Sequence, residues 1–112
     1  MTDTIFGRIA RREVSVPIVA ESERCLAIRD IAPQAPVHIL IIPKDSYASL
    51  NDVDDPAVLG DLLSLARDVA RQQGLADDGY RIVINTNRDG GQSVFHLHAH
   101  VLGGRPLGWP PG

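Results

Sequence analysis

Three histidines alternate strictly with small or apolar residues over 96–101, and the run continues apolar at Leu102. Side chains alternate between the two faces of a β-strand. The pattern therefore predicts a strand with His96, His98 and His100 on one face. Four further apolar runs predict strands over 17–21, 25–29, 37–43 and 80–86. The run 37–43 is almost wholly apolar, which favours a central strand.

Two segments have helical patterns. Residues 4–12 predict a short helix that Thr4 can cap. A long helix is expected to follow Asp55 as its N-cap, with Pro56 at its first position, and to stop at Gly74. Its apolar stripe is predicted to consist of Leu59, Leu62, Leu63, Ala66, Val69 and Ala70, and its outward face of Asp61, Ser64, Asp68 and Arg71. A helical turn is predicted over 47–50.

The connections carry turn signals. Two prolines exclude a central strand from 30–36, which is predicted to be an ordered loop. The segment 89–93, Asp-Gly-Gly-Gln-Ser, suits a hairpin turn. Its adjacent glycines also allow backbone N–H groups to converge on an anion. Because three histidines follow directly, we favour a phosphate cradle here.

The histidines themselves allow several interpretations. A single strand histidine is usually structural, but each of three would need its own buried partner. Imidazole is also a common ligand of zinc and copper. Ligands at alternate positions on one strand span roughly 13 Å, so one metal ion could take two of them and not all three. The remaining interpretation is a site that attacks an electrophile, donates protons or binds an anion.

Length and composition limit the function further. At 112 residues the chain is expected to be a single domain, 1–112. A net charge of −3 argues against a nucleic acid polymer or an anionic membrane as partner. Lys44 is the one lysine, and no phosphate-binding loop motif is present. Cys25 is the one cysteine and is expected to be a buried, inert thiol. No signal peptide or membrane-spanning run is apparent, so a cytoplasmic location is expected.

The last ten residues, 103–112, are rich in glycine and proline and contain the one tryptophan, Trp109. Such a segment cannot be regular structure. An indole is costly to leave in water. We therefore expect the tail to dock, either on its own chain or on a partner.

The run 96–102 resembles the signature of the histidine-triad (HIT) superfamily, in which three histidines alternate with apolar residues. Further segments resemble its Hint branch, and within it the purine nucleoside phosphoramidase group: 3–9, 30–38, 89–94, 103–105 and the ending Trp-Pro-Pro-Gly. The resemblance covers essentially the whole chain. It departs from the branch at Ile28, where an aromatic residue is frequent, and at Arg29, where a histidine can occur.

The resemblance implies an α+β fold with a five-stranded antiparallel sheet, one long helix and a short N-terminal helix, assembled as a homodimer. It also implies a hydrolase that cleaves the P–N bond of purine nucleoside 5′-phosphoramidates, derivatives of AMP or GMP, without a metal or other cofactor. His98 matches the nucleophile, and His96, His100 and His38 match the other site histidines. Asp30 matches the ribose ligand. The base pocket matches Ile5, Phe6, Ile9, Ile28 and Ile31, and the phosphate region matches Asn85, Gly91, Gln92 and Ser93.

The residues suggest a mechanism in which the His98 imidazole attacks phosphorus while its other nitrogen is held by an acceptor. His100, alone or with His38, is the candidate proton donor. Backbone N–H groups near Gly91 and Ser93, with His96, are expected to stabilise phosphoryl charge. The resemblance to the Hint branch favours a homodimer in which Trp109 crosses the interface and shapes the leaving-group pocket of the other subunit. The alternatives are a dinucleoside polyphosphate hydrolase or nucleotidyl transferase, a nucleotide-binding scaffold without catalysis, and a histidine metal site.

Overall fold

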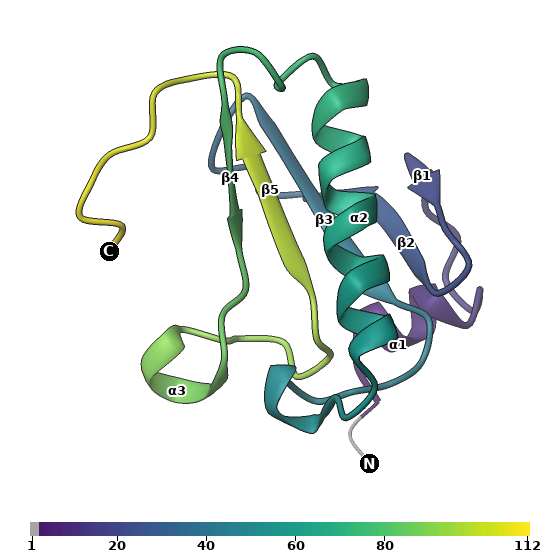
Figure 1. Cartoon of the computed structure of the whole chain (residues 1–112). Coiled ribbons are helices and arrows are strands. Elements are labelled where there is room, and N and C mark those ends of the chain that lie inside the picture. The colour runs from purple at the N-terminus through teal and green to yellow at the C-terminus, as the bar shows by residue number, and fades with distance from the viewer. Residues whose placement is uncertain (1–2) are drawn as a thin grey trace.

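The computed structural model describes residues 3–112 and contains a five-stranded antiparallel sheet in the order β1-β2-β3-β5-β4 (Figure 1). The strands are β1 (Ala20–Glu21), β2 (Cys25–Arg29), β3 (Val37–Pro43), β4 (Tyr80–Val83) and β5 (Ala99–Gly103). The predicted α+β class and antiparallel sheet are therefore confirmed. Met1 and Thr2 of the predicted domain lie outside the described residues.

Both predicted helices are present and begin at the predicted caps. Helix α1 (Ile5–Ala10) begins after Thr4, whose hydroxyl accepts the N–H of Gly7 at 3.0 Å. Helix α2 (Pro56–Gln72) begins after Asp55, whose carboxylate accepts the N–H of Ala57 at 2.9 Å. Beyond its end, Gly74 has a φ of +77°, a left-handed conformation that glycine adopts without steric cost.

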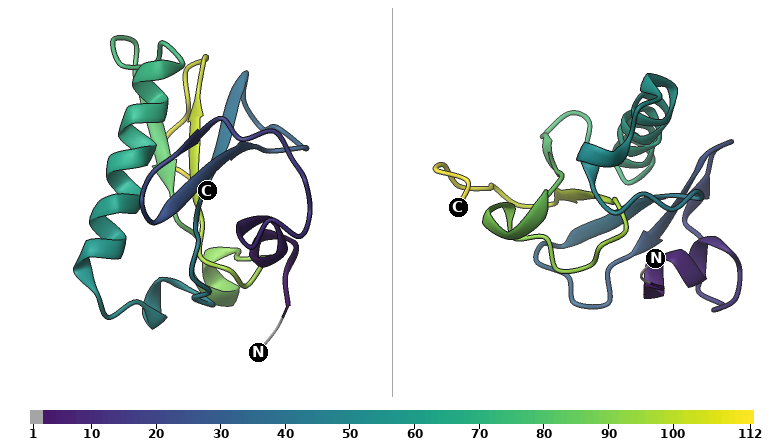
Figure 2. Two further views of the ribbon diagram at one scale, coloured as in Figure 1. Left: turned by 90° about the vertical axis from the view of Figure 1, so that its right-hand side faces the viewer. Right: turned by 90° about the horizontal axis from the view of Figure 1, so that it is seen from below.

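The two helices lie on opposite faces of the sheet (Figures 1 and 2). One apolar layer joins α2 to residues such as Ala27, Ile39, Leu97 and Val101. The other joins α1 and the segment that follows it to Leu26, Ile28, Leu40 and Ile42. Because successive strand residues face opposite sides, each strand serves both layers. The site is built on the α1 side. Within residues 3–112 no helix is long and apolar enough to cross a membrane.

The stripe of α2 differs in part from the prediction. Val58 and Leu65 are buried, whereas Leu63 is 47% exposed. Asp61, predicted to face outward, accepts a hydrogen bond from the Ser22 hydroxyl at 2.5 Å and another from the N–H of Arg24 at 3.2 Å. The helix therefore also secures the β1–β2 turn, a contact that helical periodicity cannot show.

Three strands are shorter or shifted. The predicted strand 17–21 is reduced to β1, and Pro17 has no N–H to give to the ladder. The predicted strand 80–86 ends at Val83, the last residue paired with β5. The predicted strand 96–102 begins instead at Ala99, because the N–H of Leu97 donates to the carbonyl of Tyr47 and not to a neighbouring strand.

Two short helices replace predicted turns. A 3-10 turn covers Leu50–Asp52 and not 47–50; the side chains of Ser49 and Asp52 cap it reciprocally. Helix α3 (Asn87–Gly90) stands where the hairpin turn 89–93 was predicted, and Gly91 ends it with a φ of +81°. The two adjacent glycines thus end a helical turn.

Candidate functional site

The pairing of β3 with β5 brings two histidines together. Leu40 lies opposite His100, and His38 is two residues from Leu40 on the same face of β3. His38 and His100 are therefore diagonal neighbours. Their rings meet through Nε2 of His38 and Nδ1 of His100, which are 2.8 Å apart.

A backbone group determines where the ring protons of this pair lie. The N–H of Gln34 donates to Nδ1 of His38 at 3.0 Å. A nitrogen that accepts carries no proton, so the His38 proton is on Nε2. That Nε2–H donates to Nδ1 of His100. His100 in turn keeps its own proton on Nε2.

His98 is held in the opposite tautomer. Its Nδ1 lies 2.7 Å from the carbonyl oxygen of His96, which can only accept, so Nδ1 carries the proton. Nε2 is then the nitrogen with the free lone pair, and no hydrogen bond to it is formed within residues 3–112. The ring of Phe6 packs edge-on against the His98 ring, with centroids 4.9 Å apart. This arrangement presents one nucleophilic nitrogen in a fixed orientation.

His96 takes a different position from the one predicted. It is 1% exposed and lies beneath α1, where a Cβ built on Gly7 would come within 3.6 Å of Nδ1. Its Nε2–H donates to the carbonyl of Pro43 at 2.8 Å, and its buried Nδ1 has no partner within the described residues. His96 does not line the pocket next to His98. Its imidazole therefore stabilises the end of β3 through the bond to Pro43, and its backbone carbonyl orients the His98 ring.

Burial lowers the pKa of all three histidines of the triad. Burial is the largest cause for His96, His98 and His100. The pKa of His100 falls to about 4, mainly through burial, with the nearby His98 and His38 contributing to the shift. For His98 the bond to the His96 carbonyl and the charge of Asp30 oppose the shift without cancelling it. Nε2 of His98 is thus unprotonated at neutral pH.

This shift predicts the pH dependence of the reaction proposed below. Because the pKa of His98 lies below its ordinary value of about 6.5, kcat/KM should fall to half of its plateau value only below pH 6.5. The measurement is a kcat/KM profile from pH 5 to 8 with a substrate that does not itself titrate in this range. A decline that is already half complete at or above pH 6.5 would contradict the lowered pKa.

A pocket of about 670 Å³ adjoins the histidines. His98 and His100 line it, together with all five predicted base-pocket residues: Ile5, Phe6, Ile9, Ile28 and Ile31. The segment after α1 contributes Val14 and Val16, which sequence reasoning missed. Val14, Val16 and Ile18 occupy alternate positions in the sequence, and this apolar spacing is the signal that could have identified them. The pocket wall is mainly apolar, so it suits a weakly polar ligand.

The predicted phosphate region is brought to the pocket only in part. Ser93 is exposed and lines it, whereas Asn85, Gly91 and Gln92 do not. The Gln92 side chain is buried, and its amide bonds the backbone at three places: the N–H of Asn87 and the carbonyls of Ala48 and Val94. Gln92 therefore fixes the segment before Ser93, and its amide is not free for a ligand.

Asp30 lies beside the histidine pair. Its Oδ1 accepts the N–H of Ala32 at 2.8 Å, and its Oδ2 is 3.4 Å from Nε2 of His38. Asp30, His38 and His100 could offer one metal-ligand atom each within 4.8 Å. However, the His38 atom that faces the others carries a proton, because the Gln34 N–H occupies Nδ1. The geometry therefore favours a hydrogen-bonded chain over metal coordination.

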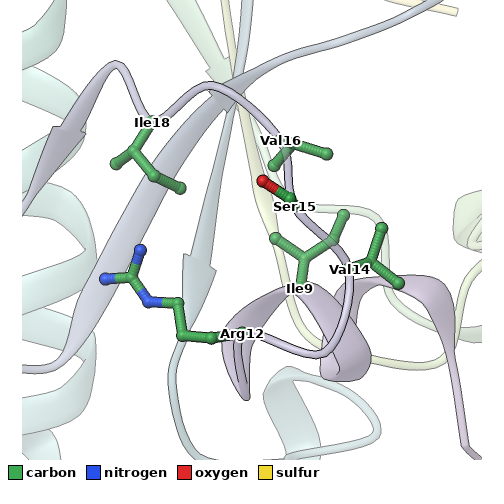
Figure 3. Close-up of a pocket in the computed structure, with 6 residues that line it drawn as sticks. All are labelled: Ile9, Arg12, Val14, Ser15, Val16 and Ile18. Atoms are coloured by element: carbon green, nitrogen blue, oxygen red, sulfur yellow. The ribbon is translucent and has the colours of Figure 1, made fainter.

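A second cavity of about 100 Å³ lies behind the segment that follows α1 (Figure 3). It shares Ile9, Val14 and Val16 with the large pocket, and its one cationic lining side chain, Arg12, is already paired with Glu21 at 2.7 Å. Cys25 is fully buried, which raises the pKa of its thiol to about 12. Neither feature offers a reactive group.

The tail extends away from the sheet (Figure 1). Arg81 holds it by donating to the carbonyl of Gly108 at 2.7 Å. Trp109 is 82% exposed and does not line the pocket of its own chain. Of the two docking possibilities for Trp109, packing on its own chain is therefore not what the structure shows.

Comparisons with known proteins agree with this geometry. The HIT domain family model matches residues 11–107. An uncharacterised HIT-like protein of Synechococcus elongatus is 57% identical, with 98% of this chain and 97% of the relative covered. The purine nucleoside phosphoramidase of Escherichia coli is 51% identical, with 95% and 91% covered. A crystal structure of a HIT family hydrolase from Legionella pneumophila superposes with a TM-score of 0.93 at 47% identity, covering 98% of this chain and 100% of that one. The chain belongs to the HIT domain family.

Proposed function

We propose that this protein hydrolyses the P–N bond of purine nucleoside 5′-phosphoramidates through a covalent nucleotidyl-His98 intermediate. The observation that carries the proposal is the tautomer of His98, whose Nδ1–H is held by the His96 carbonyl while Nε2 is left free beside the pocket. The apolar pocket supports a purine base as the ligand. The name of the Escherichia coli relative, purine nucleoside phosphoramidase, supports the same substrate class.

In the first step Nε2 of His98 attacks phosphorus, and the P–N bond breaks with its electron pair on nitrogen. The departing nitrogen takes a proton from Nε2–H of His100. As that proton leaves, Nδ1 of His100 is positioned to draw on the Nε2–H of His38, 2.8 Å away. The His38–His100 pair has then lost one proton. The positive charge that forms on the His98 ring offsets this loss of positive charge, because the His98 and His100 ring centroids are 5.0 Å apart.

In the second step water attacks phosphorus, and the bond between phosphorus and Nε2 of His98 breaks. His100 takes the proton of the water at Nε2 and returns its Nδ1 proton to Nε2 of His38, which restores the starting tautomers. The products are the amine and the nucleoside monophosphate. No step uses a metal ion, in keeping with the proton on Nε2 of His38.

The direct test is turnover of an adenosine 5′-phosphoramidate by the purified protein in the presence of a chelator. We expect release of amine and AMP. Tight binding of AMP without turnover would indicate that the protein is a nucleotide-binding scaffold and not an enzyme. Turnover that the chelator abolishes would instead indicate a metal site. Preferred cleavage of a dinucleoside polyphosphate would indicate the other enzymatic alternative.

Asp30 is proposed to bind the ribose hydroxyls, because its carboxylate can accept two hydrogen bonds at the pocket wall. Asp30→Asn keeps an acceptor for the Ala32 N–H but removes the charge. Hydrogen bonds to charged groups contribute about 1.5–3 kcal/mol, so binding of a ribonucleotide should weaken by about 10- to 100-fold. Binding of the 2′-deoxynucleotide should change less.

The measurement is calorimetric titration with both nucleotides. Asp54→Asn, which changes an exposed carboxylate outside the pocket, is the matched control. Equal loss for the two nucleotides would mean that Asp30 only shapes its loop.

We propose further that two chains form a two-fold homodimer. Strand β4 is an edge of the sheet and leaves one side of its backbone unpaired, which favours pairing with another strand. Tyr80 on β4, Leu63 on α2 and Trp109 in the tail are large apolar side chains that remain exposed. A self-complementary interface would cover them, and Trp109 would then reach the partner's leaving-group pocket.

Light scattering at micromolar concentration is therefore expected to give twice the chain mass. Deletion of 107–112 should change the preference among amine leaving groups and leave AMP affinity nearly unaltered. If the truncated protein is dimeric and its preference among amine leaving groups is unaltered, the proposed role of the tail is wrong. If the intact chain is monomeric and fully active, the proposed homodimer is wrong as well.

A further inference from the structure

We propose that Arg105 is a positioning residue for the reaction: through Gln34 it holds His38 and His100 in the tautomers that point a proton into the pocket. The inference rests on the proposed function, and it assigns a role to a side chain outside the pocket. Arg105 lies two residues beyond the end of β5 and is exposed. Its guanidinium nevertheless reaches across to the loop 30–36.

The connection consists of three successive hydrogen bonds. The Arg105 guanidinium donates to the carbonyl of Gln34 at 2.9 Å. The N–H of the same residue, Gln34, donates to Nδ1 of His38 at 3.0 Å. Nε2 of His38 then donates to Nδ1 of His100 at 2.8 Å. Arg105 and the imidazole thus bind the two backbone groups of one residue, which fixes the orientation of that residue.

Within residues 3–112 the other hydrogen bonds of the loop do not involve the backbone groups of Gln34. The Asp30 N–H donates to the carbonyl of His38 at 3.0 Å, which anchors the start of the loop. The Ala32 N–H bonds Asp30, and the Gln34 side chain bonds the carbonyl of Ala32, so both bonds are internal to the loop. Gly104 packs against Pro36, where a Cβ would come within 2.9 Å. This packing brings the chain after β5 close to the loop. Arg105 then supplies the directional contact from outside.

Without that contact the Gln34 N–H is free to turn away from His38. Nδ1 would then be free to take up the proton, and the ring would populate both tautomers, with the Asp30 carboxylate 3.4 Å from Nε2 favouring the Nε2–H form in part. A His38 ring with its proton on Nδ1 presents a lone pair to His100. The His100 ring would then carry its proton on Nδ1. Its Nε2, which faces the pocket, would have no proton to give to the leaving nitrogen.

The test combines ring-nitrogen NMR on the ligand-free protein with kinetics on the same variants. In the wild type, long-range ¹H–¹⁵N spectra should show His38 and His100 protonated at Nε2. In Arg105→Ala both rings should become mixtures of tautomers. With a phosphoramidate whose amine needs a proton, kcat should fall by about 10- to 100-fold, with little change in KM. Arg105→Lys, which keeps one donor, should restore most of both properties.

Arg81→Ala is the matched control for the NMR spectra. It also removes an arginine contact to a backbone carbonyl, that of Gly108, but has no connection to Gln34. The His38 and His100 signals should stay as in the wild type. Unchanged tautomers in Arg105→Ala would overturn the proposal whatever the rate, and so would changed tautomers with an unchanged kcat. A wild-type protein that cleaves no phosphoramidate would instead overturn the proposed function, and the NMR spectra would still decide whether Arg105 sets the tautomers.

Discussion

His98→Ala is expected to reduce phosphoramidate hydrolysis by about 10⁴-fold or more, because it removes the atom that we propose forms the covalent bond. His98 is largely buried. The substitution therefore also removes the edge-on contact with Phe6. A loss of about 0.5–3 kcal/mol in the free energy of unfolding is expected. The loss of activity and the loss of stability have to be measured separately.

Three measurements distinguish these effects. Denaturant unfolding of His98→Ala should show a folded protein, and calorimetry should show that AMP still binds. Mass spectrometry after a rapid acid-free quench should find a nucleotide adduct on the wild type and none on the variant. Free imidazole added to His98→Gly should restore part of the turnover, since it can occupy the vacated space. A folded His98→Ala protein with wild-type activity would refute the covalent mechanism.

Much of the fold could be predicted because the local signals agreed with the tertiary structure. The apolar run 37–43 became the central strand β3, and the Asp55-Pro56 cap began α2. The alternation after His96 also correctly separated two faces: Leu97, Ala99 and Val101 join the α2 layer, whereas His98 and His100 line the pocket on the other side. Period and capping are properties of the sequence itself.

Other features depend on partners distant in the sequence. His96 is drawn beneath α1 by the carbonyl of Pro43, 53 residues earlier. The Gln92 amide is hydrogen-bonded to the backbone of Ala48 and Asn87. It therefore stabilises the fold, whereas a contact with the ligand was predicted. Helix α3 is a single turn whose first residue, Asn87, has a left-handed φ of +59°. No local propensity predicts such a turn. The tautomers of His38 and His98 likewise required backbone coordinates.

His100→Gln is expected to reduce cleavage of an alkylamine phosphoramidate by about 10²- to 10⁴-fold, the contribution of a positioned general acid. The reason is the Nε2–H of His100, which the bond from His38 leaves on the pocket side. An alkylamine anion is a very poor leaving group, so P–N cleavage depends on that proton. A leaving group that departs without a proton, such as fluoride from a nucleoside 5′-phosphorofluoridate, should be released by His100→Gln at close to the wild-type rate.

The comparison of the two substrates separates proton donation from every other role of His100. If His100 only shaped the pocket or bound the phosphoryl group, both substrates would slow by the same factor. His98→Ala is the control, because loss of the nucleophile should stop both reactions. Equal losses for the amine and the fluoride in His100→Gln would contradict the assignment of His100 as the acid. The proton would then have to reach the departing nitrogen from another donor, with Ser93, which also lines the pocket, as the next residue to test.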